Sequence, residues 1–575
     1  MRIRNRSTRM HIGTRWAALI LILATMTGLL FQPSWSHPFV LDDMTKIQQN
    51  PDLRLAHPGF NDFVYPYEPT RANLRNDPSR PLTFFIYYLC WQMGEGSPVP
   101  FHFVNTVIHF LVALALAVLT VTWMQEFLLA GAFVGGALSA SLFLTAPLLA
   151  GSVFYAYALS DLLVTLFVLL ALLSRRRFYV MALFFALALA SKQTAVAFPA
   201  IVLVLDWFQG AGRRISERWR AHAGLLLVVG LYLGLRAWYL GGIGDLEAQG
   251  TPGVLEYALS QGGMILKYLL MSVVPIGLTI DHFIRPEQLS FELEILQWLL
   301  VLTVTALALG QGLRRQPGGV SKWLALSWLV FLFLLLPVSS FFPTVDLFVE
   351  RRAYLPSIGV ALALGGGLAH LLMQVSRRLR MGAMLVAALA LTVNLWSTTQ
   401  RRQVYSSKEK LWEESLRRYP LSPRAHLNLA TAWAEAHRYD EARILLERLQ
   451  TLQPENGVIY SKLGFIYAQE GYAGRSDQTA WEYYRQSFEL LPDDVVALLN
   501  AGALLMHMGN FTQASATLLH AVELSPGMAY AHFLAGQALF HGNKKIEAAP
   551  HFQKVLELEP ANVEAAKYLA ALKGM

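Results

Sequence analysis

Residues 151–177 read GSVFYAYALSDLLVTLFVLLALLSRRR. The first 23 residues of this stretch are nearly all apolar, and Asp161 carries the only charge among them. About 20 apolar residues in a helix cross the hydrocarbon core of a bilayer. Three arginines, Arg175 to Arg177, follow the apolar run directly. Short loops rich in Lys and Arg stay in the cytoplasm. The stretch therefore predicts a membrane-spanning helix whose cytoplasmic end lies at the arginines.

Similar apolar runs lie on both sides of this one. The composition agrees, because 54% of the chain is hydrophobic and only 15% is charged, against about 25% charged in a typical soluble domain. A run near 263–280 is broken by Pro275 and Gly277. We expect it to lie at the outer surface without crossing. The sequence thus predicts an all-α polytopic membrane domain over residues 1–400 with about eleven spans, at 16–33, 102–123, 128–149, 151–173, 178–191, 194–208, 222–240, 294–312, 323–342, 353–374 and 381–398.

Basic residues at the ends of these runs predict the orientation. With a cytoplasmic N-terminus and a retained first span, the loops at Arg213-Arg214, Arg314-Arg315 and Arg377–Arg380 also fall in the cytoplasm. Eleven crossings then place the C-terminus outside, although Arg401-Arg402 argue mildly against this. The net charge of +8 is explained by these loops, and no nucleic-acid-binding motif stands out. The one cysteine, Cys90, excludes an intramolecular disulfide and a multi-cysteine metal site.

Residues 408–575 carry a different periodicity. Prolines recur at intervals of 34, 38, 34 and 34 residues, at Pro420, Pro454, Pro492, Pro526 and Pro560. Small residues follow the same intervals, at Ala442, Ala480, Ala514 and Ala548 and at Ala430, Gly464, Gly502 and Gly536. A 34-residue period with small residues at two positions is typical of tetratricopeptide repeats. We expect four helical hairpins over about 421–560, capped by helices at 408–418 and 562–573. Such a solenoid offers a concave surface for an acceptor or partner, or serves as a spacer or assembly platform.

Polar residues gather at the predicted outer ends of the spans. Intramembrane polar groups are costly and usually mark function or helix pairing. The candidates for a reaction at the outer surface are Asp42, Asp43, His102, Asn105, His109, Asp161, Lys192, Asp281, His282, Glu350, Arg351 and Arg352. A carboxylate can act as a general base toward a hydroxyl or help hold a divalent cation such as Mg²⁺ or Mn²⁺. Arginines suit a phosphate leaving group.

Each candidate also has a structural explanation. Asp43 could cap a helix that begins at Met44. Asp161 could simply pair with Lys192 or an arginine, and His102 could bond a neighbouring helix. Arg351 and Arg352 could anchor to lipid headgroups. The coincidence of these residues on one membrane face favours a site.

The order of several short segments resembles a known family. An acidic pair follows the first span, then come FHFVN (101–105), SKQTAV (191–196) and ERRAYLPS (350–357), and then the repeats. This order is similar to that of the transmembrane and tetratricopeptide-repeat O-mannosyltransferases and their bacterial relatives, which are glycosyltransferases of the GT-C class. The resemblance covers nearly the whole chain.

The resemblance implies inverting transfer of a sugar from a polyprenyl-phosphate donor on the non-cytoplasmic side. It maps the family's acidic pair onto Asp42 and Asp43, and its other polar positions onto His102, Asp161, Lys192 and the Glu350-Arg351 pair. We expect His102, Asp161 and Glu350 to support the site, and the charges of Arg351, Arg352 and Lys192 to bind the donor phosphate. Two departures leave the donor open: Gln193 replaces an acid after the lysine, and Leu159-Ser160-Asp161 lacks the arginine of an Arg-Ala-Asp motif. With short loops and one cysteine, the expected location is a bacterial inner membrane with the repeats in the periplasm.

Two other functions fit the sequence less well. A non-enzymatic scaffold, in which the repeats recruit envelope components, would not need an acidic pair at the membrane surface. A transporter or flippase for a lipid-linked sugar would be expected to show paired broken spans, and only the segment near Pro275 is visibly broken.

Overall fold

The computed structural model describes residues 2–64, 76–210, 213–240, 252–285, 289–314, 318–469, 471–559 and 562–573. All regular elements in these ranges are helical, which confirms the predicted all-α fold. The chain divides into two compact units, one ending at Leu411 and the other beginning at Trp412. The division falls inside helix α17 (Lys408–Arg418), and each unit is described separately.

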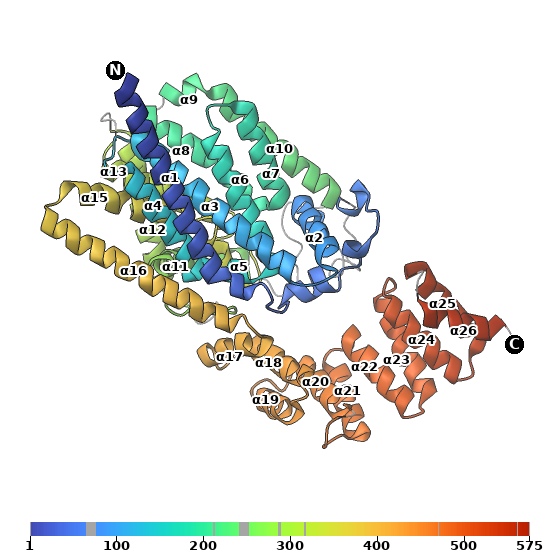
Figure 1. Ribbon diagram of the computed structural model, residues 1–575. Helices are drawn as coiled ribbons and strands as arrows, with labels where there is room; N and C mark the ends of the chain where they lie inside the picture. Colours follow the sequence, from blue (N-terminus) through green and yellow to red (C-terminus); the bar gives the residue numbers. More distant parts are fainter. Residues whose placement is uncertain are drawn as a thin grey trace. The chain divides into compact units, whose positions relative to one another are not determined.

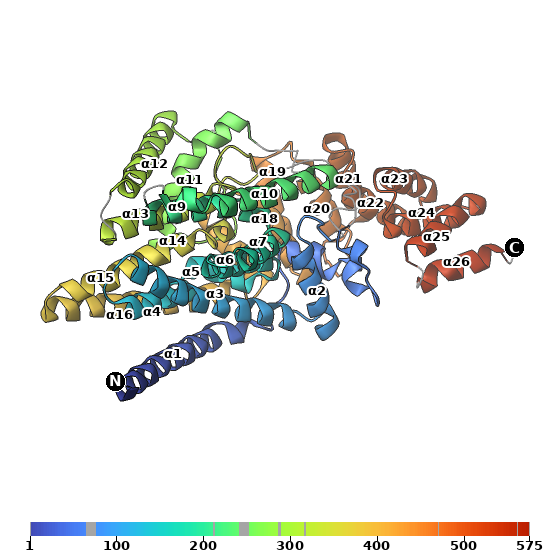
Figure 2. The ribbon, with the colours of Figure 1, turned by 90° about the horizontal axis from the view of Figure 1, so that it is seen from above.

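The first unit is a bundle of long apolar helices (Figures 1 and 2). Its helices are α1 (Arg2–Phe31), α2 (Pro81–Gly94), α3 (Val99–Glu126), α4 (Ala132–Thr145), α5 (Pro147–Phe154), α6 (Leu159–Leu173), α7 (Phe178–Ser191), α8 (Phe198–Gly210), α9 (Arg213–Glu217), α10 (Trp219–Leu240), α11 (Val254–Val273), α12 (Phe291–Gly312), α13 (Val320–Leu335), α14 (Ser357–Ala361), α15 (Gly367–Gln374) and α16 (Arg377–Val404).

Among the described residues, eight helical segments are long and apolar enough to cross a membrane. The pair α4 and α5, bent by 57°, would make a ninth, and α7 and α13 are shorter apolar helices. Each of the eleven predicted runs overlaps these segments. The number that actually crosses a membrane stays a prediction.

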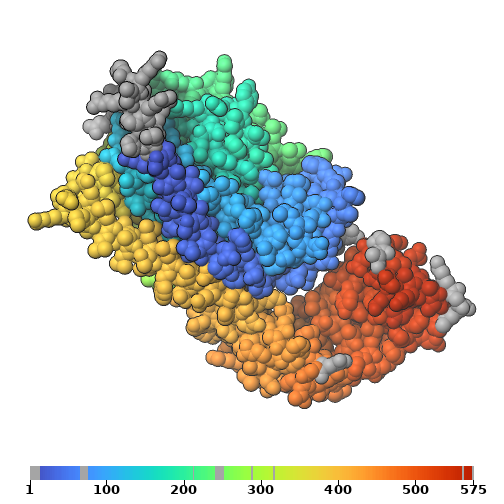
Figure 3. All heavy atoms as spheres, in the orientation of Figure 1, coloured from blue at the N-terminus to red at the C-terminus, as the bar shows by residue number. Residues whose placement is uncertain are grey.

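The side chains at the centre of the unit are buried, and those on its outside are largely apolar. Side chains of α3, α6 and α13 are mostly buried, whereas α1 and α16 lie on the outer surface (Figure 3). The outer faces remain apolar, with Leu21 and Leu385 about as exposed as surface residues of a soluble protein. Exposed leucines on long helices are what a lipid-facing surface requires. Close packing inside depends on small residues, since a Cβ on Gly136 of α4 would lie 2.7 Å from the carbonyl oxygen of Ala117 on α3.

The second unit is a run of helical hairpins. After α17 it contains α18 (Pro423–Glu435), α19 (Tyr439–Leu452), α20 (Gly457–Tyr467), α21 (Asp477–Leu490), α22 (Val495–His507), α23 (Phe511–Leu524), α24 (Ala529–His541), α25 (Lys545–Leu558) and α26 (Val563–Lys573). These are the four predicted hairpins and the final helix. The four extra residues of the second repeat fall in the connection between α20 and α21.

The small residues of the period lie where two helices of a hairpin touch. Ala442, Ala480, Ala514 and Ala548 are fully buried. A Cβ on Gly536 of α24 would lie 2.9 Å from the ring of Phe552 on α25. The prolines at 454, 492 and 526 each follow the second helix of a hairpin by two residues, because proline cannot continue a helix. Pro560 lies outside the described residues.

Candidate functional site

Asp43 is a buried anchor for the segment that follows α1. Its carboxylate is fully buried. One oxygen accepts a hydrogen bond from the Val40 amide at 3.1 Å, and the other from the Tyr157 amide at 2.7 Å. It stands before the helical turn η2 (Met44–Gln48) but makes no side-chain cap bond to it. Burial raises the pKa of the Asp43 carboxyl to about 8. Asp43 thus ties the first loop to the turn η6 (Ala156–Ala158).

Asp42 faces the other way. Its side chain is 51% exposed, and Oδ2 accepts a hydrogen bond of 2.7 Å from the Tyr155 hydroxyl. The same oxygen lies 3.6 Å from Nη1 of Arg351, which belongs to the short helix η9 (Glu350–Ala353). The Arg351 guanidinium also lies 5.7 Å from the centre of the Tyr155 ring. The accessible carboxylate of Asp42 and the guanidinium of Arg351 therefore lie close together, and both contact Tyr155.

Lys192 and Asp161 form a buried ion pair. Nζ of Lys192 lies 2.6 Å from Oδ1 of Asp161, and both side chains are at most 10% exposed. Lys192 lies in the turn between α7 and η7 (Gln193–Ala197), and Asp161 in the first turn of α6. The pairing that was one structural explanation of Asp161 is thus present. The charge of Arg351 acts on Lys192 and that of Asp161 acts on Arg351, so the pair belongs to the same cluster as Asp42.

The two arginines of η9 have different surroundings. Nη1 of Arg352 donates to the carbonyl oxygen of Asp346 at 3.0 Å, so this side chain braces its own loop. It is the guanidinium of Arg351, and not that of Arg352, that lies beside Asp42.

Glu350 fixes η9 from behind. Its carboxylate accepts hydrogen bonds from the Thr279 amide at 2.5 Å and from Nε2 of His282 at 2.9 Å, and lies 3.3 Å from Arg401 of α16. Glu350 and Arg401 are both buried. This network joins three distant segments next to Arg351, so Glu350 holds η9 in place. Burial lowers the pKa of His282, and its bond to Glu350 acts in the opposite direction.

The polar face of α3 holds the loops around the acidic pair. His102 contacts the His37 carbonyl oxygen at 3.2 Å, and Asn105 donates to the Tyr155 carbonyl oxygen at 3.0 Å. His109 contacts the Tyr354 hydroxyl at 2.6 Å. All three side chains are buried, so they position backbone and aromatic groups and do not open to solvent.

Three members of the cluster were not singled out from the sequence. Tyr155 and Tyr157 lie in an apolar run that shows no site pattern. Arg80 precedes α2, 3.5 Å from Asp77, and its charge acts on both Lys192 and Tyr157. The only signal for Arg80 is its place before Pro81, at the start of a segment otherwise without charge until Glu95.

The donor set offers little for a resident metal. Within the described ranges, no three His, Cys, Asp or Glu side chains group closely enough to hold an ion. Both oxygens of Asp43 accept backbone amides. The positive charges of this cluster are carried by the side chains of Arg351, Arg80 and Lys192.

The second unit has its own candidate surface. A groove of about 620 Å³ is lined mainly by small and apolar residues of α18, α20 and α22, and its charged lining residues are Lys462, Asp493 and Asp494. Nζ of Lys462 donates to the Thr431 hydroxyl at 2.7 Å, and burial lowers the pKa of this amine. Solenoids of helical repeats present extended concave surfaces of this kind.

Fold and site together define a multi-pass membrane protein with a tetratricopeptide-repeat unit. The family described as "Tetratricopeptide repeat" matches residues 409–457 and 499–563. Protein O-mannosyl-transferase TMTC3 of Mus musculus is 23% identical over 92% of this chain and 62% of its own length. Protein O-mannosyl-transferase TMTC1 of Mus musculus is 24% identical over 41% of this chain and 26% of its own. These matches confirm the resemblance read from the sequence. The chain thus spans less than two thirds of either relative.

Among solved structures, a thermophilic tetratricopeptide protein of Thermus thermophilus is 19% identical, with a TM-score of 0.26. The match covers 32% of this chain and 96% of that structure.

Proposed function

We propose that the protein is an inverting glycosyltransferase that moves a sugar from a polyprenyl-phosphate donor to a protein or envelope acceptor. The similarity to protein O-mannosyl-transferases supports the class of enzyme. The observation that carries the proposal is the half-exposed Asp42 beside Arg351. The membrane is that of a bacterial cell, with the reaction and the repeats on the periplasmic side. The repeats recognise the acceptor or a partner.

In the proposed reaction Asp42 acts as the general base. Its carboxylate takes the proton of the acceptor hydroxyl as the oxygen of that hydroxyl bonds to the anomeric carbon. The bond between the anomeric carbon and the phosphate oxygen breaks, and the lipid phosphate leaves with the electron pair. Arg351 stabilises the negative charge of the phosphate, because a guanidinium can donate two parallel hydrogen bonds to it. Asp43 holds the loop, and no step uses a metal.

The test is transfer by purified protein from a radiolabelled polyprenyl-phosphate hexose to envelope protein. Asp42→Asn is expected to lower the rate by about 10²–10⁴-fold, the usual worth of a general base. Arg351→Gln is expected to lower it as well. Glu256→Gln, at an exposed acid of α11, is the matched control and should leave transfer unchanged. Near-normal transfer by Asp42→Asn, at equal amounts of protein in the membrane, would refute the assignment.

A further inference from the structure

A second polar pocket lies at the opposite end of α6 from Asp161. It has a volume of about 690 Å³ and lies where α3, α6, α8, α9 and α10 end or begin. Its polar lining includes Glu126, Arg175, Asp206, Gln209, Arg214 and Arg218. This is the end of the bundle where the basic loops gather.

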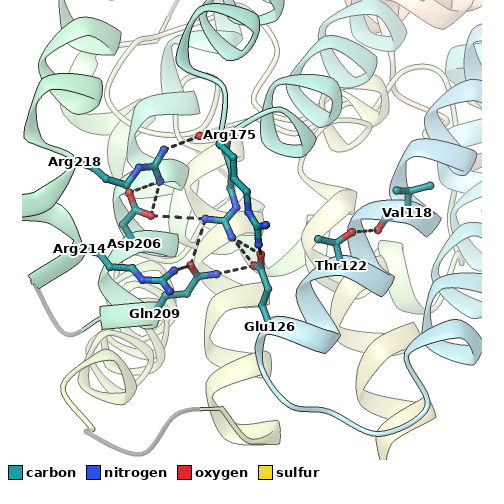
Figure 4. A network of polar contacts seen from close by, with 9 residues as sticks. Val118, Thr122, Glu126, Arg175, Asp206, Gln209, Arg214 and Arg218 are labelled. Atoms are coloured by element: carbon teal, nitrogen blue, oxygen red, sulfur yellow. Dashed lines mark hydrogen bonds and ion pairs between the residues drawn. The ribbon is translucent and has the colours of Figure 1, made fainter. Parts of the chain in front are cut away.

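The buried side of this pocket is formed by two arginine–carboxylate pairs, in which the charges neutralise each other. The Arg175 guanidinium contacts both oxygens of Glu126 at 2.6 Å, and Arg218 contacts both oxygens of Asp206 at 2.7 and 2.8 Å (Figure 4). Arg175 and Asp206 are buried. Arg218 also donates to the Arg175 carbonyl oxygen at 2.8 Å, which fixes the start of α10 against the end of α6. In each pair one guanidinium nitrogen, Nη2 of Arg175 or Nη1 of Arg218, contacts both oxygens, so each carboxylate charge is neutralised within the pocket.

The rim of the pocket carries an excess of positive charge, because its acid Glu217 lies 3.0 Å from Arg213 and is paired with it. Arg214 donates to the amide oxygen of Gln209, a neutral partner (Figure 4). The side chain of Arg176 is 82% exposed and reaches Glu126 at 3.2 Å, a carboxylate that Arg175 already neutralises. Both rim arginines therefore keep donors and charge for an anion.

One side of the pocket is apolar. Phe178 and Phe208 line it. Next to it, Tyr179 at the start of α7 and Trp219 at the start of α10 are 87% and 59% exposed. Exposed tyrosine and tryptophan at the ends of membrane helices sit at the level of the lipid headgroups. An anion bound at the rim would thus lie at headgroup depth beside apolar helix faces.

We propose that this pocket binds the phosphate of an anionic phospholipid. The phosphate lies between the guanidinium groups of Arg176 and Arg214, and the acyl chains run along the outer faces of α7 and α10. Basic pockets between membrane helices are suited to such headgroups, and arginine forks match a phosphate. A volume of about 690 Å³ accommodates a glycerophosphate headgroup. This inference is independent of the proposed sugar transfer.

The experiment measures lipid binding to the full-length, delipidated protein in detergent. Native mass spectrometry gives the affinity for the first bound phosphatidylglycerol, with the zwitterionic phosphatidylcholine, whose net charge is zero, as the comparison. Arg176→Gln with Arg214→Gln should weaken phosphatidylglycerol binding about tenfold, since two charge-assisted contacts are lost. Arg377→Gln with Arg378→Gln removes two exposed charges from another basic loop and should change it by less than about twofold.

The other outcomes also decide the proposal. Equal losses of phosphatidylglycerol affinity in the two double variants would indicate general attraction to a basic surface and would overturn the proposal. Unchanged affinity in the variant that lacks Arg176 and Arg214 would overturn it too. Phosphatidylcholine binding as tightly as phosphatidylglycerol to the unmodified protein would overturn it without any variant. Displacement of the lipid by millimolar inorganic phosphate would assign the pocket to free phosphate instead.

Discussion

Asp42 and Asp43 are adjacent in the chain, but their carboxylates lie in opposite environments. Asp43 is fully buried against backbone amides, whereas the Asp42 side chain is half exposed and lies 3.6 Å from Arg351. Leu41, just before the pair, has a φ of 53°. A leucine rarely adopts this left-handed conformation, so the surrounding contacts must hold the turn. The turn places the two carboxylates in different environments: Asp43 fixes the loop, and Asp42 is accessible to solvent.

The stability of the first unit should depend on pH through Asp43. Burial raises the pKa of this carboxyl from 3.8 to about 8, so the folded protein keeps a proton that the unfolded chain has lost. The contribution of protonated Asp43 to the free energy of unfolding is therefore fully present below pH 3.8, and it falls as the pH rises toward about 8. Thermal unfolding in detergent between about pH 5 and about pH 8 should show a falling midpoint.

Asp43→Asn is the variant that isolates this effect. The asparagine NH₂ group would face a backbone N–H donor, which costs about 1–3 kcal/mol at every pH. The midpoint should therefore be lower than in the unmodified protein but should fall less steeply with pH. Identical slopes in the two proteins would show that Asp43 is not the titrating group.

Glu350→Gln should destabilise the first unit. The glutamine oxygen can still accept from Thr279, but its NH₂ group would face the buried Arg401 guanidinium. The expected loss is about 1–3 kcal/mol of unfolding free energy, measured as a lower midpoint, with Glu256→Gln as the control. Because η9 also carries Arg351, transfer should fall as well. An unchanged midpoint would remove Glu350 from its positioning role.

Much of the fold could be predicted because it depends on patterns that extend over many residues. Apolar length and the 34-residue period identified the long helices and the hairpins. The path of the chain between the predicted spans 128–149 and 151–173 was not predictable, because residues 128–160 carry no charge. The structure forms a separate short helix there, α5 (Pro147–Phe154), in which every residue is buried. Proline at the first turn favours a new helix there, but no charge marks the bend.

The site was only partly predictable for a related reason. Acids and bases near the ends of apolar runs stand out, so Asp42, Lys192 and Arg351 could be chosen. Their pairing could not, because Tyr155 and Tyr157 reach Asp42 and Asp43 only through the break that follows α5. Whether these residues catalyse transfer remains a prediction.

The C-terminus is predicted to lie in the periplasm. Eleven crossings from a cytoplasmic N-terminus require this, and the basic loops Arg175–Arg177 and Arg213-Arg214 then share the cytoplasmic side. A reporter active only in the periplasm, fused after Met575, should be active. The same reporter fused after Arg177, at the end of the loop between α6 and α7, should be silent. Activity at the second position but not the first would invert the orientation.

Removal of the repeats should separate chemistry from recognition. A stop after Val404 would delete Tyr405 and Leu411, which are buried with Ala150 and Phe154 in the first unit. Truncation after Arg418 keeps them. This form should bind the lipid donor like the full chain but transfer sugar poorly to its natural protein acceptor. Full activity on that acceptor would exclude a role in recognition.

The pair Lys192–Asp161 allows structure and donor binding to be distinguished. Breaking a buried ion pair costs about 3–5 kcal/mol, because it leaves a buried charge, whereas replacing both partners is often neutral. Lys192→Met alone should therefore lower the unfolding midpoint, and Lys192→Met with Asp161→Leu should restore it. We expect the KM for the lipid donor to stay raised in the double variant, because the charge proposed to bind the donor phosphate together with Arg351 is lost. If the KM, the rate and the unfolding midpoint of the double variant all return to normal, Lys192 serves only to neutralise Asp161. Arg351 and Arg80 would then be the residues that bind the donor.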